Sequence, residues 1–575
     1  MSFLFQCFFF EKTQTFEKTQ TQTYRFSKKH IVFQKNICYL KIKFINNIRI
    51  ILNLMSLINH TENGALAYNW EKSGKNYICE IFSMSRGAPE IDIISKLPII
   101  LSYDKKLFIA LMFHIRGIRV LDSQNIPKGK GERLISYHMV LWLLKNDLDL
   151  FLKNYNTYIT ILGYYKDCLL LAKLAYHKDY TNQEIELLLM PLAMALMDDE
   201  NKIIQKHLNP TNNEIQISLA SKWAPREGKA FSTFIHHLKK LCNITGKKTN
   251  MKWRKFIQQI IHHKKIKTIE TLLSTKQYDL IEFKAVPSKA FNLYKKSFES
   301  IPELTERYSQ FLKQVFSGKE KIHTNAIYPH EFLKDYLINF KKKDDTIEAQ
   351  WKCYIDNAIT NSLNIERVEC NFIPMIDLSG SMFMQGKCSP GDVAITIGIL
   401  MSIINTGKFN RKALTFSSTP IMMDILGNTA FDQITSLYNA ISKEECGSMY
   451  NTNFIGAFDE LLNFILKNEI TLDEVKNLKI IAFSDMEFDA ATSSNTTPLE
   501  EIRAKYAKHD LVLPQIIFWN LNGHANKPCK SNETGVACLG GFEPSIIETF
   551  LESGELKSES LPLEVIRKYL QLVTI

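Results

Sequence analysis

Cysteine motifs, membrane spans and secretion signals are absent from this sequence. Its 11 cysteines are scattered, and none form the C-x-x-C pairs that many zinc and redox centres use. The most apolar stretch, residues 44–58, is interrupted by Asn46, Asn47, Arg49 and Asn53 and is too short to cross a bilayer. The first residues lack the basic lead and the cleavage site of a signal peptide. We therefore expect a cytoplasmic protein that makes no membrane contact.

Complete catalytic motifs are also missing. The glycine turns at 129–133 and 318–322 contain lysine but lack the G-x-x-x-x-G-K-[ST] phosphate loop. Neither Ser379 nor Ser381 is flanked by the two glycines of a nucleophile elbow. A strand ending in Asp377 is similar to the nucleophile strand of haloacid-dehalogenase-type phosphatases, but Ser379 replaces the second Asp of those enzymes. The sequence therefore predicts a protein that is not an enzyme.

Charge is unevenly distributed along the chain, whose net charge is +11. Residues 201–343 carry 28 Lys and Arg against 11 Asp and Glu, whereas residues 344–575 carry 18 against 30. The basic clusters nearest to Trp253 and Phe256 are Lys239-Lys240, Lys247-Lys248, Lys252–Lys255 and Lys264–Lys267. Cations beside aromatic rings can hold the phosphates and stack the bases of RNA. The alternatives are a solvated lysine face, or a basic surface that the acidic end neutralises within the molecule.

Periodicity divides the first part of the chain in two. Residues 1–54 contain no Gly, Pro or Asp and no regular period, which predicts a poorly ordered extension or an artefact of a start site upstream of Met55. Residues 55–345 repeat apolar positions at three- and four-residue spacing, as in Leu134–Leu144 and Glu184–Met197. This pattern predicts an α-helical domain. Stacked helical repeats remain an alternative arrangement of this domain, although the sequence shows no repeat with a fixed period.

Beyond residue 365 short apolar runs alternate with helical segments. Examples of the runs are Val368–Ile376 and Leu478–Phe483, and examples of the helical segments are Val393–Ile404 and Phe454–Leu466. Strands separated by helices imply right-handed crossovers and a mostly parallel sheet covered on both faces. We therefore expect a doubly wound α/β domain over 365–555. A linker over 346–364 and a C-terminal helix over 556–575 complete the expected multidomain architecture.

Three oxygen-bearing side chains follow the first of these runs on alternating residues. Asp377, Ser379 and Ser381 can turn toward one point, because Gly380 between the two serines permits backbone angles that larger residues resist. Carboxylate and hydroxyl oxygens suit Mg²⁺. Thr452 precedes a predicted helix and Asp485 ends a predicted strand. In an open α/β sheet the carboxyl ends of the strands form the ligand crevice, where these residues could meet.

These five residues, in this order, resemble the metal-ion-dependent adhesion site of von Willebrand factor A domains. The resemblance implies one Mg²⁺ or Mn²⁺ ion, held by Asp377, Ser379, Ser381 and Thr452, with Asp485 acting directly or through water. It also implies a protein partner that supplies an acidic residue to the metal. The expected function is that of a non-enzymatic, metal-dependent binding or scaffold protein.

Further segments are similar to one family, domain of unknown function 2828, found in plants, fungi and large DNA viruses. They are Asn63–Ala65, Gly129–Arg133, Ser317–Ile322, Tyr328–Glu331 and Phe483–Asp489. The resemblance covers about residues 60–555, and for a viral protein it implies the host cytoplasm. A more distant similarity in architecture is to the Ro ribonucleoprotein, where a helical ring that binds RNA is joined to a von Willebrand A domain. It provides the alternative function, RNA binding by the basic helical region.

Two positions depart from the A-domain pattern. Pro374 lies inside the expected central strand and cannot donate a ladder hydrogen bond, which predicts a bulge. Met486 and Glu487 follow Asp485 where many such domains have a glycine. We therefore expect the metal selectivity or affinity to differ.

Overall fold

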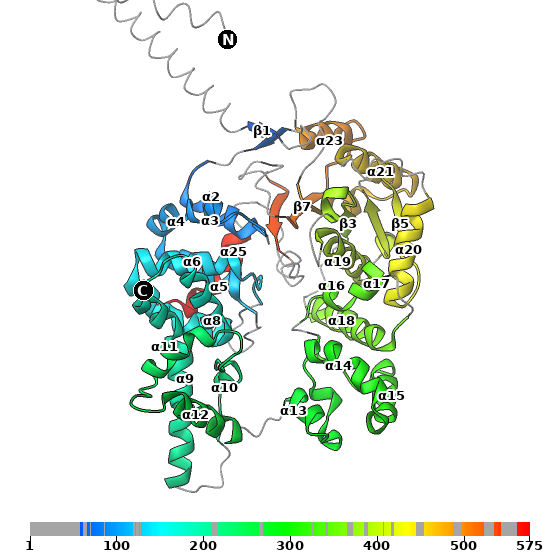
Figure 1. The fold of residues 1–575 in the computed structure, drawn as a ribbon. Coiled ribbons are helices and arrows are strands. Elements are labelled where there is room, and N and C mark those ends of the chain that lie inside the picture. Colours follow the sequence, from blue (N-terminus) through cyan, green and yellow to red (C-terminus); the bar gives the residue numbers. More distant parts are fainter. Residues whose placement is uncertain are drawn as a thin grey trace, which may run out of the picture. The chain divides into compact units, whose positions relative to one another are not determined.

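We describe the protein from a computed structural model (Figure 1). The chain forms two compact units, Met1–Leu57 and Ile58–Ile575. The first unit, and with it the expected extension over 1–54, lies outside the described residues. The structure describes residues 58–60, 66–68 and 71–575, except for 86, 119–120, 122–125, 127, 209–214, 264–267, 325–326, 340–342, 365–371, 384–388, 406, 416–418, 444–452, 487–496, 523–528, 530–533 and 542–560.

Helices dominate the described residues up to Asn364, as was predicted for residues 55–345. Local signals explain where several of them begin: Asp104 and Asp147 cap α5 and α7 by accepting hydrogen bonds from backbone N–H groups three residues later. In this part of the chain, and in the described residues beyond it, no helix combines the length and hydropathy that crossing a bilayer requires. The helices are α2 (Gly74–Ser83), α3 (Glu90–Ile94), α4 (Leu97–Tyr103), α5 (Lys105–Arg116), α6 (Leu134–Asn146), α7 (Leu148–Thr157), α8 (Lys166–Tyr176), α9 (Asn182–Leu208), α10 (Ala220–Trp223), α11 (Ile235–Leu241), α12 (Thr249–His263), α13 (Ile269–Ser274), α14 (Ser288–Ser300), α15 (Pro302–Phe316), α16 (Pro329–Phe332), α17 (Lys334–Asn339) and α18 (Asp345–Asn364). A short antiparallel pair, β1 (Ile58–His60) and β2 (Leu66–Tyr68), precedes them.

The rest of the chain forms a mixed α/β region around a six-stranded sheet with the strand order β5-β4-β3-β6-β7-β8. Every pair in this sheet is parallel except β4 and the short edge strand β5, which are antiparallel. The strands are β3 (Phe372–Ile376), β4 (Lys412–Thr415), β5 (Met422–Asp424), β6 (Lys479–Ser484), β7 (Gln515–Asn520) and β8 (Val536–Gly540). The helices are α19 (Pro390–Ile404), α20 (Ala430–Lys443), α21 (Phe454–Lys467), α22 (Leu472–Lys476), α23 (Pro498–Ala507) and α25 (Leu561–Arg567).

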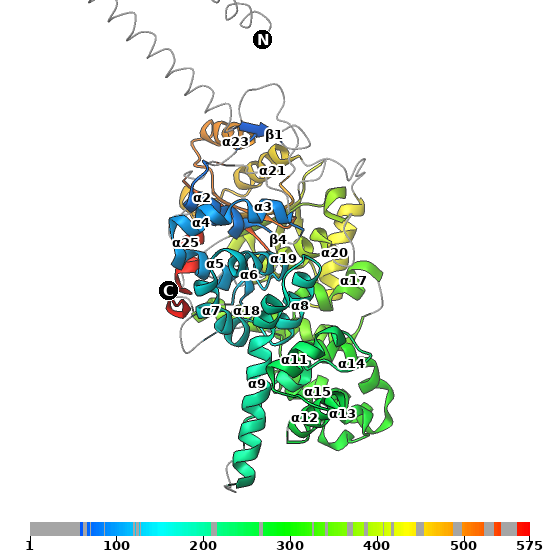
Figure 2. The ribbon, with the colours of Figure 1, turned by 60° about the vertical axis from the view of Figure 1, so that its left-hand side comes forward.

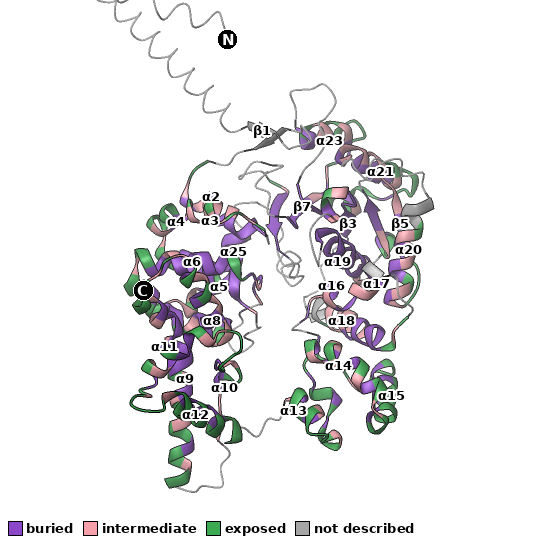
Figure 3. Ribbon diagram, viewed as in Figure 1, coloured by how far each residue is buried: buried purple, intermediate pink, exposed green. Residues whose placement is uncertain are grey.

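Both faces of this sheet are covered, because successive strand residues enter two different apolar cores. In β3, Ile376 packs with α19 and α20, whereas Ile373 and Met375 pack with α21 and α23. The same alternation holds in β6, β7 and β8. Helix α19 is buried from Pro390 to Ser402 (Figure 3), so its continuous apolar sequence reflects a helix enclosed on all sides. The chain reverses its direction of strand addition between β3 and β6.

The prediction of a bulge at Pro374 is wrong. Strand β3 pairs with β6 in unbroken register from Phe372 to Ile376, and its ladder with β4 begins only at Met375. Because the N–H of Asp377 bonds to β6 and backbone groups alternate along a strand, the nitrogen of Pro374 faces β4. It therefore lies on the side where the ladder has not yet begun, and no hydrogen bond is lost.

The side chain of Asn405 takes the place of a neighbouring strand beside Pro374. Its Oδ1 accepts a hydrogen bond from Phe372 N–H at 3.3 Å, and its Nδ2 donates to Phe372 O at 2.5 Å and to Phe409 O at 3.0 Å. Asn405→Ala should leave these buried backbone groups unsatisfied and lower the free energy of unfolding by about 2–4 kcal/mol. Urea denaturation measures this change. Asn477→Ala, at an exposed position, should have little effect, and a similar loss in both variants would contradict the role given to Asn405.

Residues 346–364, expected as a linker, lie instead within helix α18, which packs against the α/β region. The carboxylate of Glu348 accepts hydrogen bonds from Ala430 and Phe431 N–H at the start of α20, and Trp351 Nε1 donates to Gln433 Oε1 at 2.8 Å. Within residues 556–575, expected as a C-terminal helix, the structure describes the shorter helix α25, which packs against α2 and α5 (Figure 2). One apolar core therefore runs from the helices onto one face of the sheet.

Candidate metal centre

Two aspartates stand at the carboxyl ends of adjacent strands where the strand order reverses. Asp377 directly follows β3, and Asp485 directly follows β6. The N–H of Asp377 continues the ladder by donating to Phe483 O at 3.0 Å. Both side chains are fully buried. Parallel pairing of β3 with β6 thus brings together two carboxylates that are 108 positions apart in the sequence.

Hydroxyl groups surround Asp377. Its Oδ1 accepts a hydrogen bond from Ser379 N–H at 2.9 Å, and its Oδ2 accepts one from the Ser484 hydroxyl at 2.6 Å. A short helical turn, Gly380–Phe383, brings Ser381 Oγ within 3.1 Å of Ser379 Oγ. Ser379 is buried and Ser381 is exposed, so this group of oxygens extends from the interior to the surface.

The electrostatics of this group favour a cation. Burial, and after it the charge of Asp485, raises the pKa of Asp377 to about 7, whereas hydrogen bonds from Ser484 and Ser379 oppose the rise. Two buried carboxylates at adjacent strand ends repel each other, and a divalent ion would offset both their charge and their desolvation. Asp377, Asp485, Ser379 and Ser381 are all oxygen donors, so their chemistry fits Mg²⁺ or Mn²⁺.

Thr452 is the predicted ligand that lies outside the described residues. Helix α21 begins two residues later at Phe454, with Asn453 as its N-cap. Among the described side chains, no group of three or more His, Cys, Asp or Glu could hold a metal. A shell of two carboxylates and several hydroxyls contains too few of those residue types to form such a group.

The sequence did not single out Ser484. Its hydroxyl donates to Asp377 and accepts from Met486 N–H at 3.0 Å, so it links the ends of both strands. Met486 itself has φ of +68°, a left-handed conformation that suits glycine. The backbone therefore keeps the shape expected of a glycine at this position, and Met486 buries its side chain against the core that contains α21.

The two aromatic residues singled out in the basic block, Trp253 and Phe256, are not available to stack bases. Trp253 and Phe256 are 1% and 7% exposed, and Trp253 Nε1 donates to Pro225 O at 3.0 Å. Lys240 pairs with Glu186 and Arg254 with Glu227, so carboxylates of the helical region itself offset part of this charge. Lys264–Lys267 lie outside the described residues.

Comparison with known proteins supports the similarity to one family and adds a second. The chain is 26% identical over 544 residues to an uncharacterized protein, L728, of Acanthamoeba polyphaga mimivirus. This alignment covers 90% of the chain and 88% of the mimivirus protein. Residues 371–569, which contain the sheet and both aspartates, match a domain of unknown function, DUF7788. The expected similarity to the domain of unknown function DUF2828 is confirmed for residues 191–362, which match that family.

Proposed function

We propose that the α/β region is a von Willebrand factor A-like domain whose adhesion site binds one Mg²⁺ or Mn²⁺. The observation that carries the proposal is the buried pair Asp377 and Asp485 at the point where the strand order reverses, with the hydroxyls of Ser379 and Ser381 beside it. Such a crevice is where open α/β sheets bind their ligands. Asp377, Ser379 and Ser381 would hold the ion, Asp485 would act directly or through water, and Thr452 is the expected further ligand.

The proposed activity is metal-dependent binding of a protein, without catalysis. Asp377 accepts hydrogen bonds from Ser379 and Ser484, and the described residues of this site include no nucleophile with an adjacent base. Ser381, at the exposed end of the group, would lie nearest to a partner. An acidic side chain of that partner would complete the shell, because the ion prefers carboxylate oxygen. The chain would then act as a scaffold in the cytoplasm, which is the host cytoplasm for a viral protein.

Counting the bound Mn²⁺ ions tests this proposal. Electron paramagnetic resonance of free Mn²⁺ during a titration should give one site per chain, and Mg²⁺ should compete for it. Chelation with EDTA should leave the far-ultraviolet circular dichroism unchanged, because the sheet and its two cores do not depend on the ion. Absence of a saturable Mn²⁺ site in the folded protein would overturn the assignment.

RNA binding by the helical region is the second candidate, in line with the distant similarity to the Ro ribonucleoprotein. The excess of 28 Lys and Arg over 11 Asp and Glu in residues 201–343 favours it, and Lys247 and Lys255 are exposed. Because Trp253 and Phe256 are buried, this candidate function rests on phosphate contacts.

In filter-binding titrations, affinity for single-stranded RNA should fall steeply as salt rises, because phosphate contacts release counterions. Lys247→Gln and Lys255→Gln should each reduce the slope by about 1 on logarithmic axes. Lys476→Gln, in the α/β region, should not change it. Absence of binding at low salt would leave the protein-binding proposal alone.

A further inference from the structure

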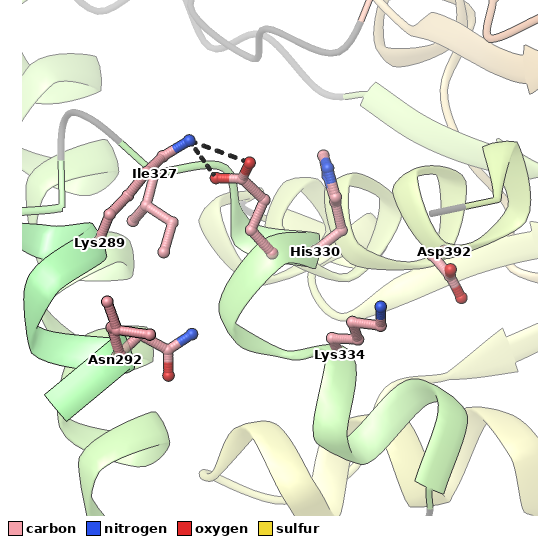
Figure 4. Close-up of a pocket in the computed structure, with 8 residues that line it drawn as sticks. Lys289, Asn292, Ile327, His330, Lys334 and Asp392 are labelled. Carbon is pink, nitrogen blue, oxygen red and sulfur yellow. Dashed lines mark hydrogen bonds and ion pairs between the residues drawn. The ribbon is translucent and has the colours of Figure 1, made fainter. Parts of the chain in front are cut away.

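A second site candidate is a cavity of about 760 Å³ in the helical region, away from the strand ends. Its wall includes the end of α5, the loop before α6, Tyr164 and Tyr328. An adjoining cavity of about 450 Å³ (Figure 4) shares Lys289, Ile327 and Glu331 with it. The larger volume lies in the range of pockets that bind small molecules.

Arg116, one of the residues that line this cavity, has an unused donor. The guanidinium is fully buried, and its Nε and Nη2 donate to Asp167 Oδ2 at 3.0 and 2.6 Å. Asp167 is fixed in turn by the Tyr137 hydroxyl at 2.6 Å and by Tyr164 N–H at 3.1 Å. Nη1 of Arg116 has no hydrogen-bond partner within the described part of the chain. Because a buried donor without a partner is costly, this atom points to a ligand.

Other cations gather around the same wall. The guanidinium carbons of Arg116 and Arg133 lie 5.4 and 5.7 Å from the centre of the Tyr164 ring. Lys128 Nζ lies 5.2 Å from the centre of the Tyr328 ring. Asp167 offsets the charge of Arg116, whereas an anion in the cavity would offset the charge of Arg133.

The glycine turn at 129–133 shapes this wall. Gly131 has φ of +66°, and a Cβ there would lie 2.6 Å from the Tyr328 hydroxyl, which donates to Lys130 O at 3.2 Å. The side chain of Lys130 turns into the protein, where it donates to the carbonyl groups of Phe82 and Met84. The turn thus packs against Tyr328 and leaves Lys128 and Arg133 on the cavity side.

We propose that this cavity binds a phosphorylated small molecule, with its phosphate held by Arg116, Arg133 and Lys128. A phosphate monoester offers three acceptor oxygens and nearly two negative charges to three cationic groups, whereas a carboxylate offers two oxygens and one charge. Two carboxylates, Glu132 and Glu331, also line the cavity. Lys289 Nζ lies 3.1 Å from the Glu331 carboxylate, so this carboxylate is already paired.

The remaining volume indicates that the ligand is larger than phosphate alone. Apolar side chains of Ile118, Leu134, Ile135 and Ile327 line the rest of the cavity. They would contact the organic part of the molecule, while the cations fix its orientation. The phosphate group would therefore fix the position of the ligand, and the apolar side chains would determine the affinity for its organic part.

Calorimetric titration of the full chain with inorganic phosphate and with AMP tests the proposal. EDTA is present throughout, so that no ion at the strand ends can bind phosphate and the result is independent of the metal proposal. Both probes should bind at low salt, AMP more tightly than phosphate, and acetate and adenosine should bind at least tenfold more weakly than AMP. If neither probe binds, or if adenosine binds as well as AMP, the proposal is overturned.

Variants locate the binding. Arg133→Gln and Lys128→Gln should each weaken AMP binding by about tenfold or more, the loss expected for one charge-assisted hydrogen bond. Arg133 is exposed, so its substitution should not affect folding, whereas Arg116→Lys disturbs the buried pair with Asp167. Lys284→Gln, an exposed substitution outside the cavity lining, is the matched control. Unchanged AMP affinity in a folded Arg133→Gln variant would overturn the assignment.

Discussion

Asp377→Ala is expected to abolish the binding of Mg²⁺ and Mn²⁺. The substitution removes one of the two buried carboxylates and also the acceptor that orients Ser379 and Ser484. A site that keeps only Asp485 and hydroxyl groups lacks half of its formal negative charge, and hard cations depend strongly on that charge. Calorimetry should show the loss of all measurable heat of binding, corresponding to at least a hundredfold weaker affinity, on the order of 3 kcal/mol.

Two comparisons make this result specific to the site. Asp473→Ala removes an exposed carboxylate in α22 and should leave Mg²⁺ affinity unchanged. Asp377→Asn keeps the size of the side chain, so loss of binding in this variant attributes the effect to charge and not to a cavity. Undiminished Mg²⁺ binding by the folded Asp377→Ala variant would show that the ion binds elsewhere.

Without metal, stability should fall as pH rises from about 4 to 7. Burial and the neighbouring Asp485 raise the pKa of Asp377 to about 7, well above its value in an unfolded chain. Within this window the folded state holds a proton that the unfolded state releases, so each step upward in pH favours unfolding. The free energy of unfolding should therefore decrease by about 1 kcal/mol for each pH unit within this window.

Urea denaturation in EDTA at several pH values measures this dependence, and the difference between wild type and Asp377→Asn isolates it from other titrating groups. The asparagine variant should lack the contribution. Saturating Mg²⁺ should also remove it in the wild type, because the ion binds the deprotonated carboxylate. Equal pH profiles for wild type and Asp377→Asn in EDTA would contradict the raised pKa.

Long periodic elements and strand ends could be predicted from the sequence, whereas short elements and long-range partners could not. The runs at Val368–Ile376 and Leu478–Phe483 correspond to β3 and β6, because buried parallel strands are continuous apolar segments. Strand β5 has three residues, Met422–Asp424, which is too few for any period to show. Its antiparallel pairing with β4 therefore came only from the structure.

The ligands of the candidate site could be predicted where they directly follow a strand that the sequence itself indicates. Asp377 and Asp485 could be placed at strand ends, but the hydrogen bond from Ser484 to Asp377 spans 107 residues and leaves no local signal. The prediction of a bulge at Pro374 failed for the same reason, because Asn405, which bonds to Phe372, lies 33 residues away in the sequence. The pairing of Arg116 with Asp167 spans 51 residues, so the second cavity could not be inferred from the glycine turn alone.

The contacts of α18 make the stability of the helices depend on what binds to the sheet. Glu348 and Trp351 bond to α20, and the apolar core is continuous from the helices to the sheet face that α19 covers. The helices that share this core should therefore unfold together with the sheet. An ion bound only by the folded state would then protect these helices and the sheet, by about 2.7 kcal/mol at a hundred times its dissociation constant. Amide hydrogens in α5 and α6, remote in sequence from Asp377, would exchange more slowly when the metal is present.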